Sequence, residues 1–67
     1  MATTVIEVIG MSCDHCKHSV ETALAECAGV ESAVVDLDAG TATVVHDDSV
    51  AFDTFKNAIE EVGYDVA

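Results

Sequence analysis

The spacing of hydrophobic residues changes period several times along the chain, and this change most strongly constrains its fold. From Thr3 to Ile9 nearly every residue is β-branched, and the side chains divide between two faces as in a strand. Gly10 interrupts this run. Apolar residues then recur at helical spacing, at positions Cys16, Val20, Ala23, Leu24 and Cys27. Gly29 is suited to end that helix, so the N-terminal half predicts a strand followed by an amphipathic helix.

Two further alternating runs follow this helix. Residues 30–38 alternate, and residues 41–46 alternate again, with Ala42, Val44 and His46 on one side. A short turn containing glycine separates the two runs. This arrangement predicts a β-hairpin.

The C-terminal part returns to helical spacing before the chain ends. The apolar positions of this second helix are Phe52, Phe55, Ile59 and Val62. Gly63 ends the helix, and residues 64–67 are expected to form a short last strand.

The expected order of elements is therefore β-α-β-β-α-β. This order is typical of the α+β class and of the ferredoxin-like βαββαβ sandwich, a four-stranded antiparallel sheet with two helices on one face. No proline, linker or low-complexity segment interrupts the chain. We expect residues 1–67 to form a single domain.

The charge balance excludes several classes of partner. Two basic residues against 13 acidic ones give a net charge of −11, which disfavours nucleic acid and anionic lipid as partners. No apolar run is long enough to span a bilayer, so membrane insertion is not expected. Three cysteines without a secretory signal favour the reducing cytoplasm. The acidity also predicts a halophilic source, because concentrated salt screens like charges.

The chemistry-bearing residues gather in the loop between the first strand and the first helix. Residues 10–16 read Gly-Met-Ser-Cys-Asp-His-Cys, which places Cys13 and Cys16 one helical turn apart. Side chains at this spacing have Cβ atoms about 5 to 6 Å apart, so two sulfurs can reach one ion through bonds of about 2.3 Å. The helix N-terminus favours the thiolate that metal binding requires.

The number of ligands indicates which metal such a loop would hold. Structural zinc takes four donors, whereas two soft thiolates suit Cu(I). Two ligands also leave the ion accessible to a second pair of thiolates. A redox dithiol is the alternative interpretation, but a thioredoxin-like domain usually carries a cis-proline and this chain has no proline.

In this context the chain resembles the heavy-metal-associated domains, of the free-standing copper chaperone type. The residues that carry the resemblance, between Ile6 and Val66, are the loop 10–16, Val20, Leu24, Gly29, Val30, the hairpin 35–44 and the segment 58–64. The chain departs from the family in being more acidic, and in having Cys27 where Leu or Val is common and His46 where an aromatic residue is common.

The resemblance implies that Cys13 and Cys16 bind Cu(I) and that Met11 packs beneath the loop. It also implies that Tyr64 lies near the metal, where its hydroxyl could reach a thiolate. His15 is expected to point outward, where it could tune the thiolates or join the metal in a dimer. Cys27 is expected to be a small buried hydrophobic residue.

The expected function is that of a cytoplasmic Cu(I) metallochaperone, not an enzyme, that hands copper to the metal-binding domain of a copper-transporting P-type ATPase. We expect a monomer, or a dimer bridged by metal. Three alternatives stay open: a metal-binding regulatory domain of such an ATPase, a Zn(II) or Hg(II) module and, ranked last, a thiol oxidoreductase. The start at Met1 favours a free-standing protein over the ATPase domain.

Overall fold

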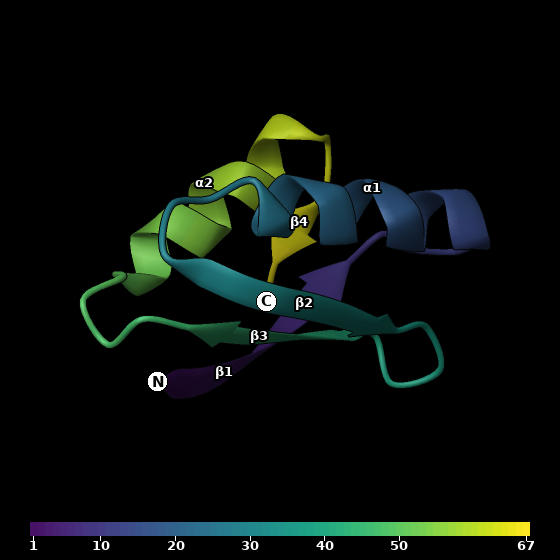
Figure 1. Ribbon diagram of the computed structural model, residues 1–67. Coiled ribbons are helices and arrows are strands. Elements are labelled where there is room, and N and C mark those ends of the chain that lie inside the picture. Colours follow the sequence, from purple (N-terminus) through teal and green to yellow (C-terminus); the bar gives the residue numbers. More distant parts are fainter.

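The computed structural model describes residues 1–67 and contains the six expected elements in the expected order (Figure 1). Their bounds are β1 (Ala2–Ile9), α1 (Asp14–Ala25), β2 (Val30–Asp36), β3 (Thr41–His46), α2 (Phe52–Glu61) and β4 (Asp65–Val66). Neither helix has the length and hydrophobicity needed to cross a membrane.

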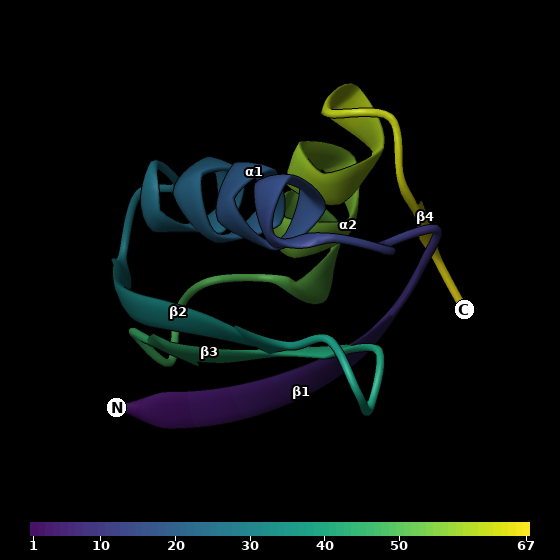
Figure 2. The same ribbon diagram turned by 90° about the vertical axis from the view of Figure 1, so that its right-hand side faces the viewer.

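The four strands form one antiparallel sheet in the order β2-β3-β1-β4. Both helices pack on the same face of this sheet, and the opposite face is left uncovered (Figures 1 and 2). The prediction of a ferredoxin-like βαββαβ sandwich is therefore confirmed. In this topology the loop that carries the cysteine pair leaves the end of β1, a central strand, and enters α1 directly.

The core lies between the sheet and the two helices. Its nine buried hydrophobic residues are Ile6, Val8, Val20, Leu24, Val35, Ala42, Val44, Phe55 and Ile59. They come from five of the six elements and match the faces that the alternation and the helical spacing predicted. Burial of this set supplies the main stabilising contribution to the fold.

The structure corrects the expected apolar face of α2. Phe55 and Ile59 are buried, whereas Phe52 is 46% exposed and Val62 is 39% exposed. Phe52 is the first residue of α2, and Val62 lies just past its end, so both extend beyond the part of the helix that covers the sheet. Helical spacing alone therefore overestimated the width of the buried stripe.

Three element bounds also differ from expectation. The helix α1 ends at Ala25, before Cys27, which the helical spacing had included, and β4 is limited to Asp65–Val66. The strand β2 ends at Asp36, because the turn already begins there. The Asp36 carbonyl accepts a hydrogen bond from the Gly40 N–H (2.9 Å), and its carboxylate accepts one from the Ala39 N–H (3.2 Å).

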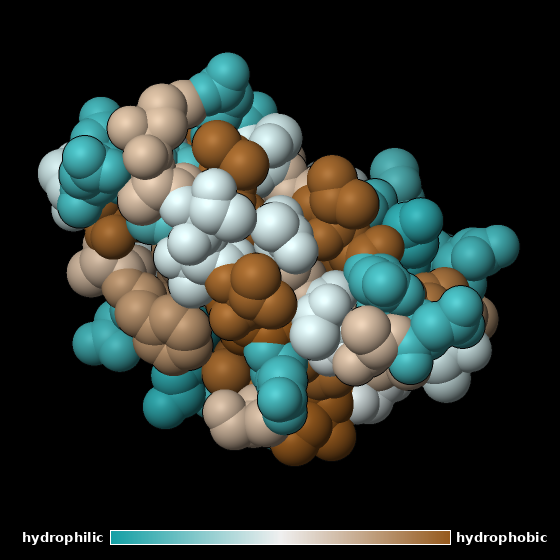
Figure 3. Space-filling model, turned by 90° about the horizontal axis from the view of Figure 1, so that it is seen from below, coloured by the Kyte–Doolittle hydropathy of each residue, from teal (hydrophilic) through white to brown (hydrophobic).

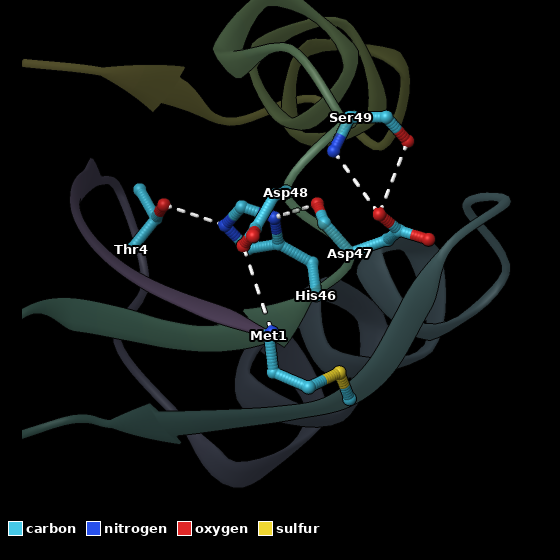
Figure 4. A network of polar contacts seen from close by, with 6 residues as sticks. All are labelled: Met1, Thr4, His46, Asp47, Asp48 and Ser49. Atoms are coloured by element: carbon cyan, nitrogen blue, oxygen red, sulfur yellow. Dashed lines mark hydrogen bonds and ion pairs between the residues drawn. The ribbon is translucent and has the colours of Figure 1, made fainter.

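His46 is the one polar residue in the core, with only 4% of its surface exposed. Its Nδ1 lies 2.8 Å from the Asp47 carbonyl, which can only accept, so Nδ1 carries the proton (Figure 4). Its Nε2 lies 2.7 Å from the Thr4 hydroxyl, and its ring meets Phe55 edge-on at a centroid distance of 4.8 Å. His46 thus fills the aromatic position and links β1 to the connection between β3 and α2.

The uncovered face of the sheet carries several hydrophobic side chains, seen in brown in Figure 3. Val5, Ile9 and Val34 are all more than half exposed, and each belongs to a strand of the sheet. Their side chains alternate with those that enter the core, as the strand period requires.

Candidate metal centre

The cysteine pair lies where the chain turns from β1 into α1. Gly10 has a φ of +101°, a backbone conformation that glycine adopts without strain, and it starts the turn. Cys13 is the N-cap of α1, with extended backbone angles, and its carbonyl accepts the first helical hydrogen bond from the Lys17 N–H (3.0 Å). Cys16 lies in the first turn of the helix. The helix start therefore holds the backbone of both cysteines.

The two sulfur atoms converge. Cys13 Sγ and Cys16 Sγ lie 3.4 Å apart, and neither is in a disulfide. Cys13 is exposed and Cys16 is half-buried. Two sulfurs this close can share one thiol proton, or ligate one ion with bonds of about 2.3 Å after a small adjustment. The spacing of the two cysteines in the sequence correctly predicted this convergence.

The site favours the ionised form of Cys16. The pKa of its thiol is lowered from 9.0 to about 6. The largest cause is the backbone N–H of Ser12, followed by the Tyr64 hydroxyl and the Cys13 thiol, and these outweigh the opposing effect of desolvation. At pH 7 Cys16 is therefore mainly a thiolate, the form that binds metals.

Tyr64 reaches the site from the opposite end of the chain. Its ring lies over the loop, since a Cβ atom added to Gly10 would be 3.4 Å from the Tyr64 Cδ1. Its backbone N–H bonds the Ile59 carbonyl (3.2 Å), which anchors it behind α2. The interaction with Cys16 raises the pKa of the Tyr64 hydroxyl, which thus remains a proton donor at neutral pH.

The remaining candidate side chains are not gathered around the sulfurs. Met11 is partly buried and packs against the core. His15 is exposed on the first turn of α1, as expected from its position between the cysteines. No group of three or more His, Cys, Asp or Glu side chains is placed to hold a metal ion.

Ser12, which makes the largest contribution to the lowered pKa of Cys16, was not among the site residues predicted from the sequence. It acts through its backbone N–H, which any residue type at this position except proline would supply. The only available signal was its place just before a helix N-terminus, where free N–H groups are expected.

Cys27 lies apart from this site, at the other end of α1. It is half-buried rather than fully buried, and its thiol donates a hydrogen bond to the Ala23 carbonyl (3.5 Å). Burial, followed by the charges of Glu26 and Glu61, raises the pKa of its thiol. A thiol that keeps its proton is a poor nucleophile and a poor metal ligand, so Cys27 contributes packing.

Comparison with known proteins identifies the group to which this arrangement belongs. The family model for the heavy-metal-associated domain matches residues 5–65. The chain belongs to the heavy-metal-associated domain family. The match includes the cysteine loop, both helices and Tyr64.

Relatives of this heavy-metal-associated domain include copper chaperones. The copper chaperone CopZ of Staphylococcus saprophyticus is 58% identical over 67 residues, which cover 98% of each chain. A solved structure of a CopZ metallochaperone has a TM-score of 0.95 and 49% identity, covering 98% of this chain and 100% of the other. A copper-binding domain from HMA7, a P-type ATPase, has a TM-score of 0.94 and 37% identity, covering 100% and 92%.

Proposed function

We propose that this protein is a Cu(I) metallochaperone that holds the ion between Cys13 and Cys16 and passes it on by thiolate exchange. The observation that carries the proposal is the pair of sulfurs 3.4 Å apart at a helix N-terminus, one of them lowered in pKa to about 6. Two soft sulfur donors, with Cys16 favoured as the thiolate, match the low coordination number and the ligand preference of Cu(I).

The exposure of the two cysteines suggests how the cargo leaves. A thiolate of the partner adds to copper and forms a three-sulfur intermediate. A bond from copper to one chaperone sulfur then breaks, and that sulfur leaves as a thiolate. Cys13 is the more exposed of the pair, so its bond to copper breaks first. The remaining Cu–Cys16 bond then yields to a second partner thiolate. Copper stays Cu(I) throughout, so the exchange needs no oxidant.

The relatives support both the cargo and the recipient. The curated relatives carry the name copper chaperone, and a copper-binding domain of a P-type ATPase has nearly the same fold. We therefore propose the metal-binding domain of a copper-transporting P-type ATPase as the recipient. The protein would act as a carrier, not an enzyme, and in the reducing cytoplasm, where both thiols stay available.

A competition titration of the reduced protein with a Cu(I) chelator tests the ligand assignment. Cys13→Ser and Cys16→Ser should each lose tight binding while circular dichroism shows an intact fold, because neither thiol is part of the buried core. Cys27→Ser is the matched control and should bind as the wild type does. Wild-type affinity in either site variant would refute the two-thiolate site.

The same titration with Zn(II) separates the alternative cargo. Zinc prefers four donors, so we expect it to bind far more weakly than Cu(I) to the two sulfurs. Tighter binding of Zn(II) would instead favour a zinc module. Mixing the Cu(I)-loaded protein with a P-type ATPase metal-binding domain, followed by separation on an anion-exchange column, tests transfer. Copper that remains on the chaperone after mixing would contradict the proposed recipient.

A further inference from the structure

The N-terminal half of β1 has a neighbouring strand on one side only. Along Ala2–Glu7, β1 pairs with β3, whereas β4 pairs only with Val8 and Ile9. One more hydrogen bond, from the Ala67 N–H to the Glu7 carbonyl (3.0 Å), marks the end of that pairing. On the N-terminal side of Glu7, the edge of β1 that faces away from β3 is open. Figure 2 shows no strand beside this part of β1.

The direction of the backbone groups along this edge follows from these bonds. The Glu7 carbonyl points toward the β4 side, and the Val8 N–H points the other way, to the Gly40 carbonyl (2.9 Å). Backbone groups alternate in direction along a strand, so those of Thr3 and Val5 also point to the open edge. No hydrogen bond within the protein uses them on that side.

We propose that this open edge pairs with the same edge of a second copy of the chain, antiparallel, to form a copper-independent dimer. An antiparallel pair of identical edges is related by a two-fold axis, so one segment serves both partners. Residues 2–6 carry no charged side chain, on a protein with a net charge of −11. This neutral stretch is thus a place where two acidic copies can approach.

The opposite edge of the sheet is closed to such pairing. There the Glu21 carboxylate of α1 accepts a hydrogen bond from the outward N–H of Val35 in β2 (2.8 Å). The acidic residues Glu31 and Asp36 belong to the same strand. A bonded carboxylate and charged residues along an edge strand hinder strand addition. The comparison between the two edges favours β1 as the site of association.

The end of β4 restricts the register of the dimer. The place opposite Glu7 is filled by Ala67, so a partner strand can extend only up to that point. With Thr3 opposite the partner's Thr3, the outward groups of these two residues exchange both of their hydrogen bonds. Val5 then lies opposite the partner's Met1, so the side chains that meet across the interface are uncharged.

The proposed interface leaves the metal centre free. The open edge lies at the start of β1, and the cysteine loop follows the other end of the same strand. Dimerisation at this edge therefore needs no copper and does not cover Cys13. A dimer bridged by metal through the cysteine loop would behave in the opposite way, which makes the two kinds of dimer distinguishable.

Sedimentation velocity of the reduced, metal-free protein tests the proposal in about 1 M KCl, where the Debye length is about 3 Å. We expect the sedimentation coefficient to rise between micromolar and millimolar protein. Over the same range, amide hydrogen exchange at Thr3 and Val5 should slow. Val5→Lys should abolish the rise, because it replaces an apolar side chain opposite the partner's Met1 with a charged one that the interface would have to desolvate.

Val34→Lys is the matched control. Val34 is 60% exposed and Val5 is 62% exposed, and both lie on the uncovered face, but Val34 belongs to the closed edge strand β2. The control should dimerise as the wild type does. A sedimentation coefficient that is independent of concentration, or unchanged exchange at Thr3 and Val5, would overturn the proposal. So would an equal loss in both lysine variants, which would indicate association through the face of the sheet.

Discussion

Tyr64 and Cys16 shift each other's acidity in opposite directions. The hydroxyl of Tyr64 helps to lower the pKa of the Cys16 thiol to about 6, and the same interaction raises the pKa of Tyr64. A donor that keeps its proton thus stabilises the neighbouring thiolate. The two residues are far apart in sequence, and the fold brings them together by placing the segment after α2 over Gly10.

The first prediction removes only this hydroxyl. In Tyr64→Phe the ring still covers Gly10, but the thiolate loses one of its stabilising partners. The pKa of Cys16 should rise above about 6 and remain below 9.0, because the Ser12 N–H, the larger cause, is retained. Titration of the thiolate absorbance measures the pKa of Cys16. In a Cys16→Ser background, Tyr64→Phe should cause no such shift. An unchanged midpoint would mean that the hydroxyl does not act on Cys16.

The second prediction concerns stability of the metal-free protein against pH. Cys16 has a lower pKa in the folded protein, about 6, than the ordinary value of 9.0. Its contribution is therefore fully present above pH 9 and is lost as the pH falls through about 6. The free energies of unfolding of the wild type and of Cys16→Ser, measured in urea, should differ most at high pH and converge below pH 6. A difference that grows on acidification would contradict this sign.

The third prediction separates packing from ligation at Met11. Met→Ala at a fully buried site costs about 2 to 5 kcal/mol, and Met11 is only partly buried against the core, so we expect about 1 to 2 kcal/mol. Urea unfolding measures this loss. Affinity for Cu(I) should change little, since Met11 would act by supporting the loop. Met11→Leu, which keeps the volume but not the sulfur, should restore stability. Lost affinity with unchanged stability would instead make Met11 a ligand.

Local patterns were sufficient to predict the elements and the convergence of the cysteines. Alternation requires only a period of two, and the sulfurs of Cys13 and Cys16 meet because both lie on one helical turn. The proximity of Tyr64 to Cys16 could only be inferred from the family resemblance, because it depends on how β4 joins β1. The exposure of Phe52 could not be predicted either, since it depends on how far α2 extends past the sheet.

The fourth prediction concerns salt. Thirteen acidic residues face two basic ones, and the one ion pair joins the terminal amine of Met1 to Asp48 at 3.6 Å. Raising KCl to about 1 M shortens the Debye length to about 3 Å, so the repulsion between carboxylates should weaken and the melting temperature should rise. For a domain of this size each 1 kcal/mol gained raises Tm by about 4 to 8 °C. Glu60→Gln should show a smaller gain. A Tm that does not respond to KCl would remove the halophile hypothesis.

The fifth prediction uses two glycines to separate backbone strain from steric overlap. Gly29 and Gly63 have similar positive φ angles, +86° and +93°. Alanine at either position should cost about 1 to 2 kcal/mol, because L-residues are strained in this conformation. A Cβ atom at Gly29 would also lie 2.6 Å from the Val50 Cγ2, whereas nothing lies within 4 Å at Gly63. Overpacking of this kind adds about 1 to 3 kcal/mol. In urea unfolding, Gly29→Ala should therefore be clearly less stable than Gly63→Ala, and equal losses would show that Val50 moves aside without cost.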